Sequence, residues 1–169
     1  LHDPIHPQVA ASFTDMDGYM HPHSYLRMPN GHVLASFQHA HHAVTQGTGA
    51  SGGLVEIDDH GKLVRSTSSA DPAFPNALLT PYSLVVLADK DRVVATDSSM
   101  HLENIFSGVT YQVWRLSDLK LLKTSYFDVG ENRYSQIGPQ EPRLGPDGSV
   151  FVQTLSCGIE RITDVDTND

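Results

Sequence analysis

Histidine is concentrated at the start of this chain. The stretch "HPHSYLRMPNGHVLASFQHAHHA", residues 21–43, holds six histidines, and eight of the ten in the chain precede residue 43. Neutral imidazole nitrogen is a preferred ligand of copper, zinc, nickel and iron. A useful site needs three or four such nitrogens converging at about 2.0–2.2 Å from the metal. The stretch is therefore a candidate metal site, and exposed loop histidines with no ligand role are the alternative.

The spacing of these histidines suggests which of them point together. Side chains at i and i+2 of a β-strand share one face, so His21 and His23 can face the same way. His39 and His41 have the same spacing, with His42 on the other side. The elements around these pairs decide whether the two pairs approach one point.

Those elements are predicted to be strands. Short runs rich in β-branched and aromatic residues alternate with Asn-Gly, Asp-His-Gly and Pro-Asp-Gly turns, and helical periodicity is almost absent. The pattern predicts an all-β chain with strands near 25–28, 32–37, 53–58, 62–67, 82–88, 92–97, 110–116, 120–127, 141–144, 149–155 and 158–163.

The strands follow a repeat. The segments 25–36, 84–96 and 141–154 share one design, in which an apolar strand, a polar turn and a β-branched strand follow one another. Val33, Val93 and Val150 mark equivalent points, 60 and 57 residues apart. A meander of antiparallel strands repeated at fixed spacing is typical of a β-propeller. We predict a β-propeller fragment of about three four-stranded antiparallel blades, with Trp114 packed between blades.

The repeat sets the expected organisation. Residues 1–20 are predicted to be a connecting segment, and 21–169 a partial propeller with units at about 21–80, 81–138 and 139–169. A closed propeller typically needs four to eight blades, so three leave sheet faces uncovered. We therefore expect the remaining blades or a partner chain to complete the ring.

Two long loops are expected on the same face of the propeller. They span roughly 37–51 and 97–109, and they carry His39, His41 and His101. Asp97 ends the strand before the second loop. Its carboxylate would either orient a ligating histidine or cap the loop backbone.

Five motifs resemble the selenium-binding protein family, which includes bacterial methanethiol oxidases. They are "HPHSYLRMPNGHVLAS", "GTGASGGLVEID", "RVVATDSS", "TYQVWRLSDLKLLKTSYFDVG" and "VFVQTLSCGIERI", in the family's order, and the likeness runs from about residue 20 to 163. The resemblance implies a seven-bladed propeller and a copper-dependent oxidoreductase that acts on small thiols such as methanethiol. Of four implied histidine ligands, His23 matches one, and Leu26, Lys90 and Gly145 stand at or near the other three.

Composition excludes several classes of function. The net charge of −9 at pH 7 leaves no basic patch for nucleic acid or an anionic membrane. No apolar stretch reaches the length of about 20 residues that spans a bilayer. Cys157 is the single cysteine, so a disulfide within the chain and a cysteine zinc cluster are excluded, and we expect this thiol to be buried. The chain begins at Leu1 without a signal-peptide pattern, which leaves the compartment open.

Two functions from different classes remain. One is a metal-dependent oxidoreductase of the methanethiol oxidase type, with metal ligands among His23, His21, His39, His41 and His101, and Asp97 behind them. The other is a non-catalytic propeller that serves as a binding scaffold for a ligand or a protein. Stoichiometric bound metal distinguishes the first from the second.

Overall fold

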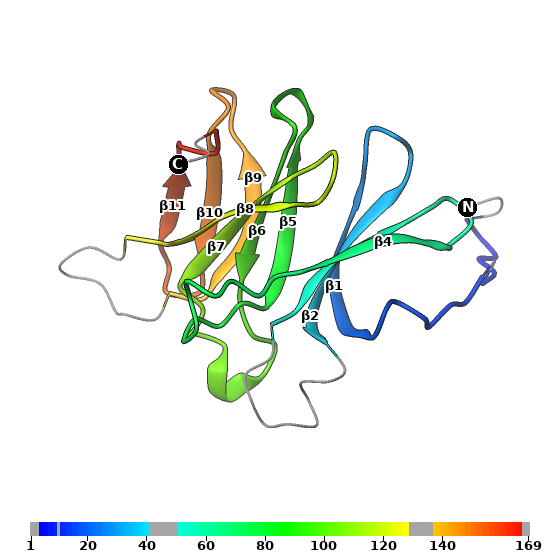
Figure 1. Cartoon of the computed structure of the whole chain (residues 1–169), viewed down its shortest axis with the longest axis horizontal. Helices are drawn as coiled ribbons and strands as arrows, with labels where there is room; N and C mark the ends of the chain where they lie inside the picture. Colours follow the sequence, from blue (N-terminus) through cyan, green and yellow to red (C-terminus); the bar gives the residue numbers. More distant parts are fainter. Residues whose placement is uncertain (1–3, 10, 41–50, 129–136, 167–169) are drawn as a thin grey trace.

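The described part of the chain folds into three antiparallel sheets in the computed structural model (Figure 1). The structure describes residues 4–9, 11–40, 51–128 and 137–166. The strands of the first sheet are β1 (Tyr19–Arg27), β2 (Val33–Ala40), β3 (Gly53–Ile57) and β4 (Leu63–Ser68). Those of the second are β5 (Pro81–Leu87), β6 (Arg92–Asp97), β7 (Thr110–Arg115) and β8 (Leu121–Tyr126), and those of the third are β9 (Pro139–Leu144), β10 (Val150–Thr154) and β11 (Ile159–Ile162).

Each sheet is a meander in chain order, which confirms the predicted all-β propeller architecture. The first two sheets run β1-β2-β3-β4 and β5-β6-β7-β8, and the third joins β9, β10 and β11. Helix is limited to two short 3-10 turns in the described residues, η1 (Ala88–Lys90) and η2 (Leu102–Asn104). Strand β1 begins at Tyr19, earlier than the predicted 25–28, because a bulge between Pro22 and Tyr25 interrupts the alternation that marks a strand.

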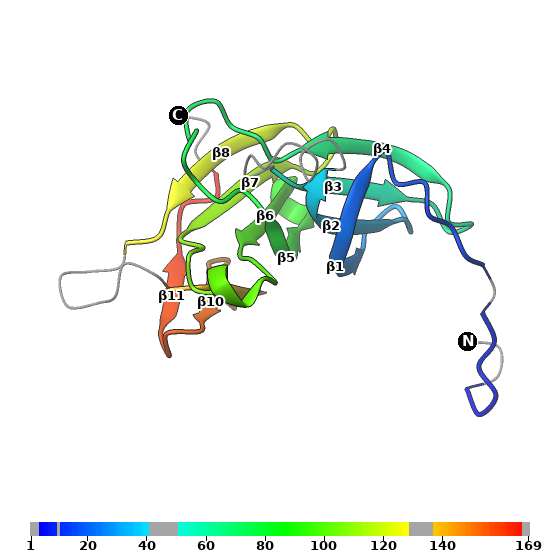
Figure 2. The ribbon, with the colours of Figure 1, turned by 90° about the horizontal axis from the view of Figure 1, so that it is seen from below.

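The sheets stand side by side along an arc. Figure 2 shows β4 and β8 on its convex side and β1 and β5 toward its concave side. Leu34 and Leu54 of the first sheet share one apolar cluster with Leu84 and Trp114 of the second, and Trp114 is 0% exposed, as predicted for a residue between blades. A second cluster joins the second and third sheets through residues that include Val94, Val113, Val150 and Val152.

A repeated arrangement of a proline, a bulge and a hydrogen bond links β1, β5 and β9 of the three sheets. Pro22, Pro81 and Pro139 begin equivalent segments of β1, β5 and β9, and each strand has a bulge just after its proline. The hydroxyl of Ser36 accepts from Ser24 N at 3.0 Å and donates to Tyr82 O in the next sheet at 2.7 Å. Thr96 repeats the link, because its hydroxyl donates to Gln140 O at 2.6 Å. The same hydrogen bond therefore recurs from blade to blade.

Cys157 differs from its prediction. It lies in the turn between β10 and β11, where its backbone adopts a φ of +65°, and its side chain is exposed. The expectation of a buried thiol was wrong, because the flanking apolar residues belong to two strands and the cysteine falls in the tight turn between them. No helix in the described ranges is long and apolar enough to cross a membrane.

Candidate functional site

Strands β2 and β6 end on the same side of the molecule (Figure 1). In Figure 1 the end of β2 and the segment that contains η2 both lie at the bottom of the view, away from the β1–β2 and β5–β6 hairpins. We call this side the loop face. It is the face on which the repeat predicted a site.

Three histidines from three segments meet at the loop face. The ring centres of His21 (β1) and His39 (β2) are 5.3 Å apart, with the rings edge to face. The ring centres of His39 and His101 are 5.7 Å apart, and His101 directly precedes η2. His39 is half-buried between the exposed His21 and His101. We call these three residues the histidine cluster.

His21 and His23 do not share a site, although their spacing predicted a common strand face. His21 has a φ of +58°, and the bulge that follows Pro22 shifts the register of β1 against β2. The alternation of side chains that the prediction assumed holds only for regular strand geometry. His21 therefore turns to His39, while His23 turns to the neighbouring sheet.

His23 is fixed against Tyr82 of the second sheet. Its ring stacks on the Tyr82 ring with the centres 3.6 Å apart, and its Nδ1 lies 2.9 Å from the Tyr82 carbonyl oxygen. Because a carbonyl oxygen only accepts, Nδ1 carries the proton and Nε2 of the neutral ring keeps its lone pair. Histidines that bind metals commonly donate to a backbone carbonyl in this way. His23 is therefore in the tautomer that a metal ligand adopts.

The other positions implied by the family resemblance do not supply ligands. Leu26 packs against the apolar cluster between the first two sheets, and Lys90 forms an ion pair with Asp166. A Cβ on Gly145 would lie 2.5 Å from the Phe151 ring, so a side chain there would force the ring to move. The ligand set that the resemblance implies is therefore not kept at these three positions.

The geometry of the histidine cluster is more open than that of a preformed metal site. Within residues 4–9, 11–40, 51–128 and 137–166, no three His, Cys, Asp or Glu side chains are arranged to hold a metal ion as they stand. His41 lies outside the described residues. The cluster consists of two imidazole pairs that share His39, and its two outer rings are exposed.

Asp97 lies beneath the loop face and is fully buried. Thr110 Oγ1 donates to its Oδ2 at 3.0 Å, and among the described residues Oδ1 has no hydrogen-bond partner. Burial raises the pKa of this carboxyl well above its ordinary value, and the Thr110 bond opposes the rise only in part. Its hydrogen bond goes to a threonine of β7, so orientation of a histidine by Asp97 stays a prediction.

Replacing Asp97 with asparagine is expected to stabilise the protein at pH 7 by at least about 1 kcal/mol. Because the pKa of Asp97 is higher in the folded than in the unfolded protein, its contribution to stability is fully present below the unfolded pKa of about 4. This contribution is progressively lost as the pH rises through the folded pKa. Asparagine mimics the protonated acid, so the decline should disappear in denaturant unfolding measured from pH 4 to pH 8. An unchanged pH dependence in the variant would contradict a neutral buried Asp97.

The residue that joins the two histidine-bearing segments was not singled out by the sequence pattern. Gln38, next to His39, is 1% exposed and bonds to Ser98 and Met100 of the second sheet's loop. A signal was present, because Gln38 continues the i, i+2 series of Leu34 and Ser36 on the strand face that packs on the second sheet. A large polar residue on such a face needs a partner.

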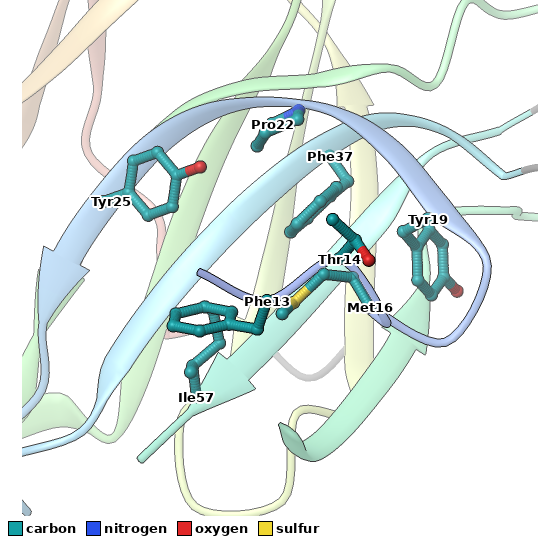
Figure 3. Close-up of a pocket in the computed structure, with 8 residues that line it drawn as sticks. All are labelled: Phe13, Thr14, Met16, Tyr19, Pro22, Tyr25, Phe37 and Ile57. Carbon is teal, nitrogen blue, oxygen red and sulfur yellow. The ribbon is translucent and has the colours of Figure 1, made fainter. Parts of the chain in front are cut away.

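A separate apolar pocket of about 260 Å³ lies on the other face of the first sheet. Figure 3 shows Phe13 close to Ile57, with Met16 and Phe37 beside them. The lining is Phe13, Thr14, Met16, Tyr19, Pro22, Tyr25, Phe37 and Ile57, without a charged side chain. Phe37 and Ile57 point away from the second sheet, so the pocket is not part of the histidine cluster.

Comparison with known proteins gives similarity at the level of the fold. No family model matches the sequence, and no curated protein matches it. The solved structures that it resembles include a hypothetical selenium-binding protein from Sulfolobus tokodaii, with a TM-score of 0.54 and 15% identity over 80% of this chain and 30% of that one. A candidate oxidoreductase (glucose dehydrogenase) from Thermus thermophilus gives a TM-score of 0.51 and 15% identity over 88% of this chain and 45% of the other.

A protein of unknown function from Bacteroides caccae is similar to the same degree, with a TM-score of 0.50, 12% identity and coverage of 88% of this chain and 43% of that one. The chain thus spans less than half the length of each of these three structures. At such identities the likeness extends to the architecture alone. The chain is distantly similar in structure to propeller-type proteins, a hypothetical selenium-binding protein among them.

Proposed function

We propose that this propeller segment binds a transition-metal ion at the loop face through His21, His39 and His101. The observation that carries the proposal is the meeting of three imidazoles from β1, β2 and the β6–β7 connection. Imidazole donors favour copper or zinc over magnesium or calcium. The net charge of −9 adds a general attraction for cations.

The separations support this proposal. Two imidazoles that bind one metal at about 2.0–2.1 Å from each nitrogen have ring centres about 5 Å apart. The two pairs, at 5.3 and 5.7 Å, are close to that value. His21 and His101 are exposed, so their rings can rotate about the side-chain bonds on a fast timescale and turn a nitrogen toward the ion. His39 is the member common to both pairs.

Replacing His39 with alanine is expected to weaken Cu²⁺ or Zn²⁺ binding by 10- to 100-fold, because each remaining histidine loses its partner. Binding should also weaken as the pH falls, because protons compete with the metal for imidazole nitrogens. Isothermal titration with each metal measures both effects. His60→Ala is the matched control, because His60 is an 85% exposed histidine in the β3–β4 turn. Equal affinity in the two variants would refute the assignment.

We further propose, as the activity of the complete propeller, copper-dependent oxidation of small thiols such as methanethiol by molecular oxygen, in which methanethiol, oxygen and water give formaldehyde, hydrogen sulfide and hydrogen peroxide. Copper would supply the redox chemistry, and further blades or a partner chain would complete the ring. The support is the motif resemblance together with the imidazole donors of the histidine cluster. Oxygen consumption by the copper-loaded protein in the presence of methanethiol tests the activity, with His39→Ala as the variant that should lose it.

A second candidate is a metal-free binding scaffold. It is favoured by Leu26, Lys90 and Gly145, which occupy implied ligand positions with structural contacts only. On this alternative, chelator-treated protein keeps its ligand affinity and the histidine variants bind no less metal than the parent. The same titrations therefore separate the two candidates.

A further inference from the structure

We propose that Gln38 is a positioning residue that sets the separation of His39 and His101. The inference rests on the proposed metal site and assigns its geometry to a side chain that binds no metal. His39 lies in β2 of the first sheet and His101 in the β6–β7 connection of the second, 62 positions apart in the sequence. Some contact between the sheets must hold them near each other, and the structure shows one at the residue next to His39.

The amide of Gln38 bonds to the second sheet in both directions. Its Nε2 donates to Ser98 O at 2.8 Å, and its Oε1 accepts from Met100 N at 3.1 Å. Met100 directly precedes His101, as Gln38 directly precedes His39. One side chain therefore links the two residues that are covalently next to the two ligands. At 1% exposure its hydrogen bonds do not compete with bulk water.

The segment 98–101, to which Gln38 bonds, also has hydrogen bonds to its own sheet and to the third sheet. Thr80 Oγ1 donates to Ser98 O at 3.0 Å, and Gln140 Nε2 of the third sheet donates to Ser98 Oγ at 3.1 Å. His101 N donates to Ser99 Oγ at 3.0 Å. The loop is thus anchored to its own sheet and to the third, so the bonds from Gln38 determine where it lies relative to the first sheet and to His39.

Methionine at position 38 isolates this role. Methionine has nearly the length and volume of glutamine, so the space between the sheets stays filled. It has no group that can donate to Ser98, and its sulfur is only a weak acceptor for Met100 N. Gln112 provides a matched control. It is a 0% exposed glutamine whose Nε2 joins the second sheet to Ser69 O at 2.7 Å, and it lies in β7 away from the histidine cluster. Both substitutions remove buried hydrogen bonds between blade units.

The experiment is a Cu²⁺ titration of the full chain and of the Gln38→Met, Gln112→Met, His101→Ala and Gln38→Met/His101→Ala variants. Gln38→Met is expected to weaken binding by about 10-fold or more, as is typical when a residue behind the ligands is lost, and Gln112→Met by less than about 2-fold. In the His101→Ala background, Gln38→Met should cause no further loss. A merely structural role would lower affinity in both backgrounds.

Nuclear Overhauser contacts between the imidazole protons of His39 and His101 provide a metal-free readout. We expect them in the parent chain and not in Gln38→Met. Equal copper affinities for the Gln38 and Gln112 variants, or a Gln38 effect that persists without His101, would overturn the inference. If the parent binds no copper, the proposed function fails, and imidazole contacts retained in Gln38→Met would then overturn the positioning role separately.

Discussion

Replacing Trp114 with alanine is expected to lower the free energy of unfolding by about 3–5 kcal/mol. Trp114 is the largest of the fully buried side chains and lies between the first and second sheets with Leu34, Leu54 and Leu84. Removing the indole leaves a cavity that the paired strands on either side cannot close, because their hydrogen bonds fix the backbone. Urea unfolding followed by far-ultraviolet circular dichroism measures the loss, since Trp114 is the only tryptophan and its fluorescence goes with it.

Two further substitutions serve as comparisons for the stability loss of Trp114→Ala. Trp114→Phe keeps most of the apolar volume and removes an indole Nε1–H that is buried without a partner among the described residues, so its cost should be clearly smaller. Leu102→Ala removes a side chain that is 83% exposed and should change stability by less than about 0.5 kcal/mol. If Trp114→Ala cost as little as Leu102→Ala, the close contact between the sheets would be wrong.

Replacing Glu56 with alanine is expected to lower the free energy of unfolding by about 2–3 kcal/mol at pH 7. Breaking a fully buried ion pair would cost more, but the partners of Glu56 are partly exposed. Glu56 is 2% exposed and accepts hydrogen bonds from Asn30, His32 and Arg65. Arg65 also donates to the carbonyl oxygens of Leu116 and Ser117 in the second sheet. The alanine variant leaves the arginine without its counter-charge and loosens a second link between the first two blades. Chemical unfolding of the two proteins gives the difference.

The pH dependence provides an independent check on Glu56. Burial alone would raise the pKa of its carboxyl, but the hydrogen bonds from His32, Asn30 and Arg65 outweigh burial and hold the pKa below its ordinary value. A depressed pKa contributes stability above the unfolded value of about 4.3, and this contribution is lost as the pH falls through the lower folded value. The stability gap between the parent and Glu56→Gln should therefore narrow from pH 7 to pH 3. Glu103→Gln, at an exposed position in η2, should show no such change, and a constant gap for Glu56 would contradict the depressed pKa.

The architecture could be predicted from residue patterns. Strand alternation, turn residues and the spacing of Val33, Val93 and Val150 are local or periodic properties, and apart from the early start of β1 the strands lie close to where these properties predicted them. The place of Trp114 between blades followed from the same pattern. The concentration of histidine marked the part of the chain that carries the candidate site, and the repeat predicted that the segments of His39 and His101 share one face. The predicted loop at 37–51 began too early, because β2 continues to Ala40 and contains His39.

The tertiary structure alone decided which histidines meet. His21 and His23 were expected to act together, but a bulge and one left-handed residue in β1 send the first to His39 and the second to Tyr82. Such a bulge depends on hydrogen bonds to the partner strand, which a residue pattern does not specify. The contact of His39 with His101 and the two bonds of Gln38 join residues about 60 positions apart across two sheets. Their separation is set by how the blades pack, and the periodicity of either strand alone contains no information about it.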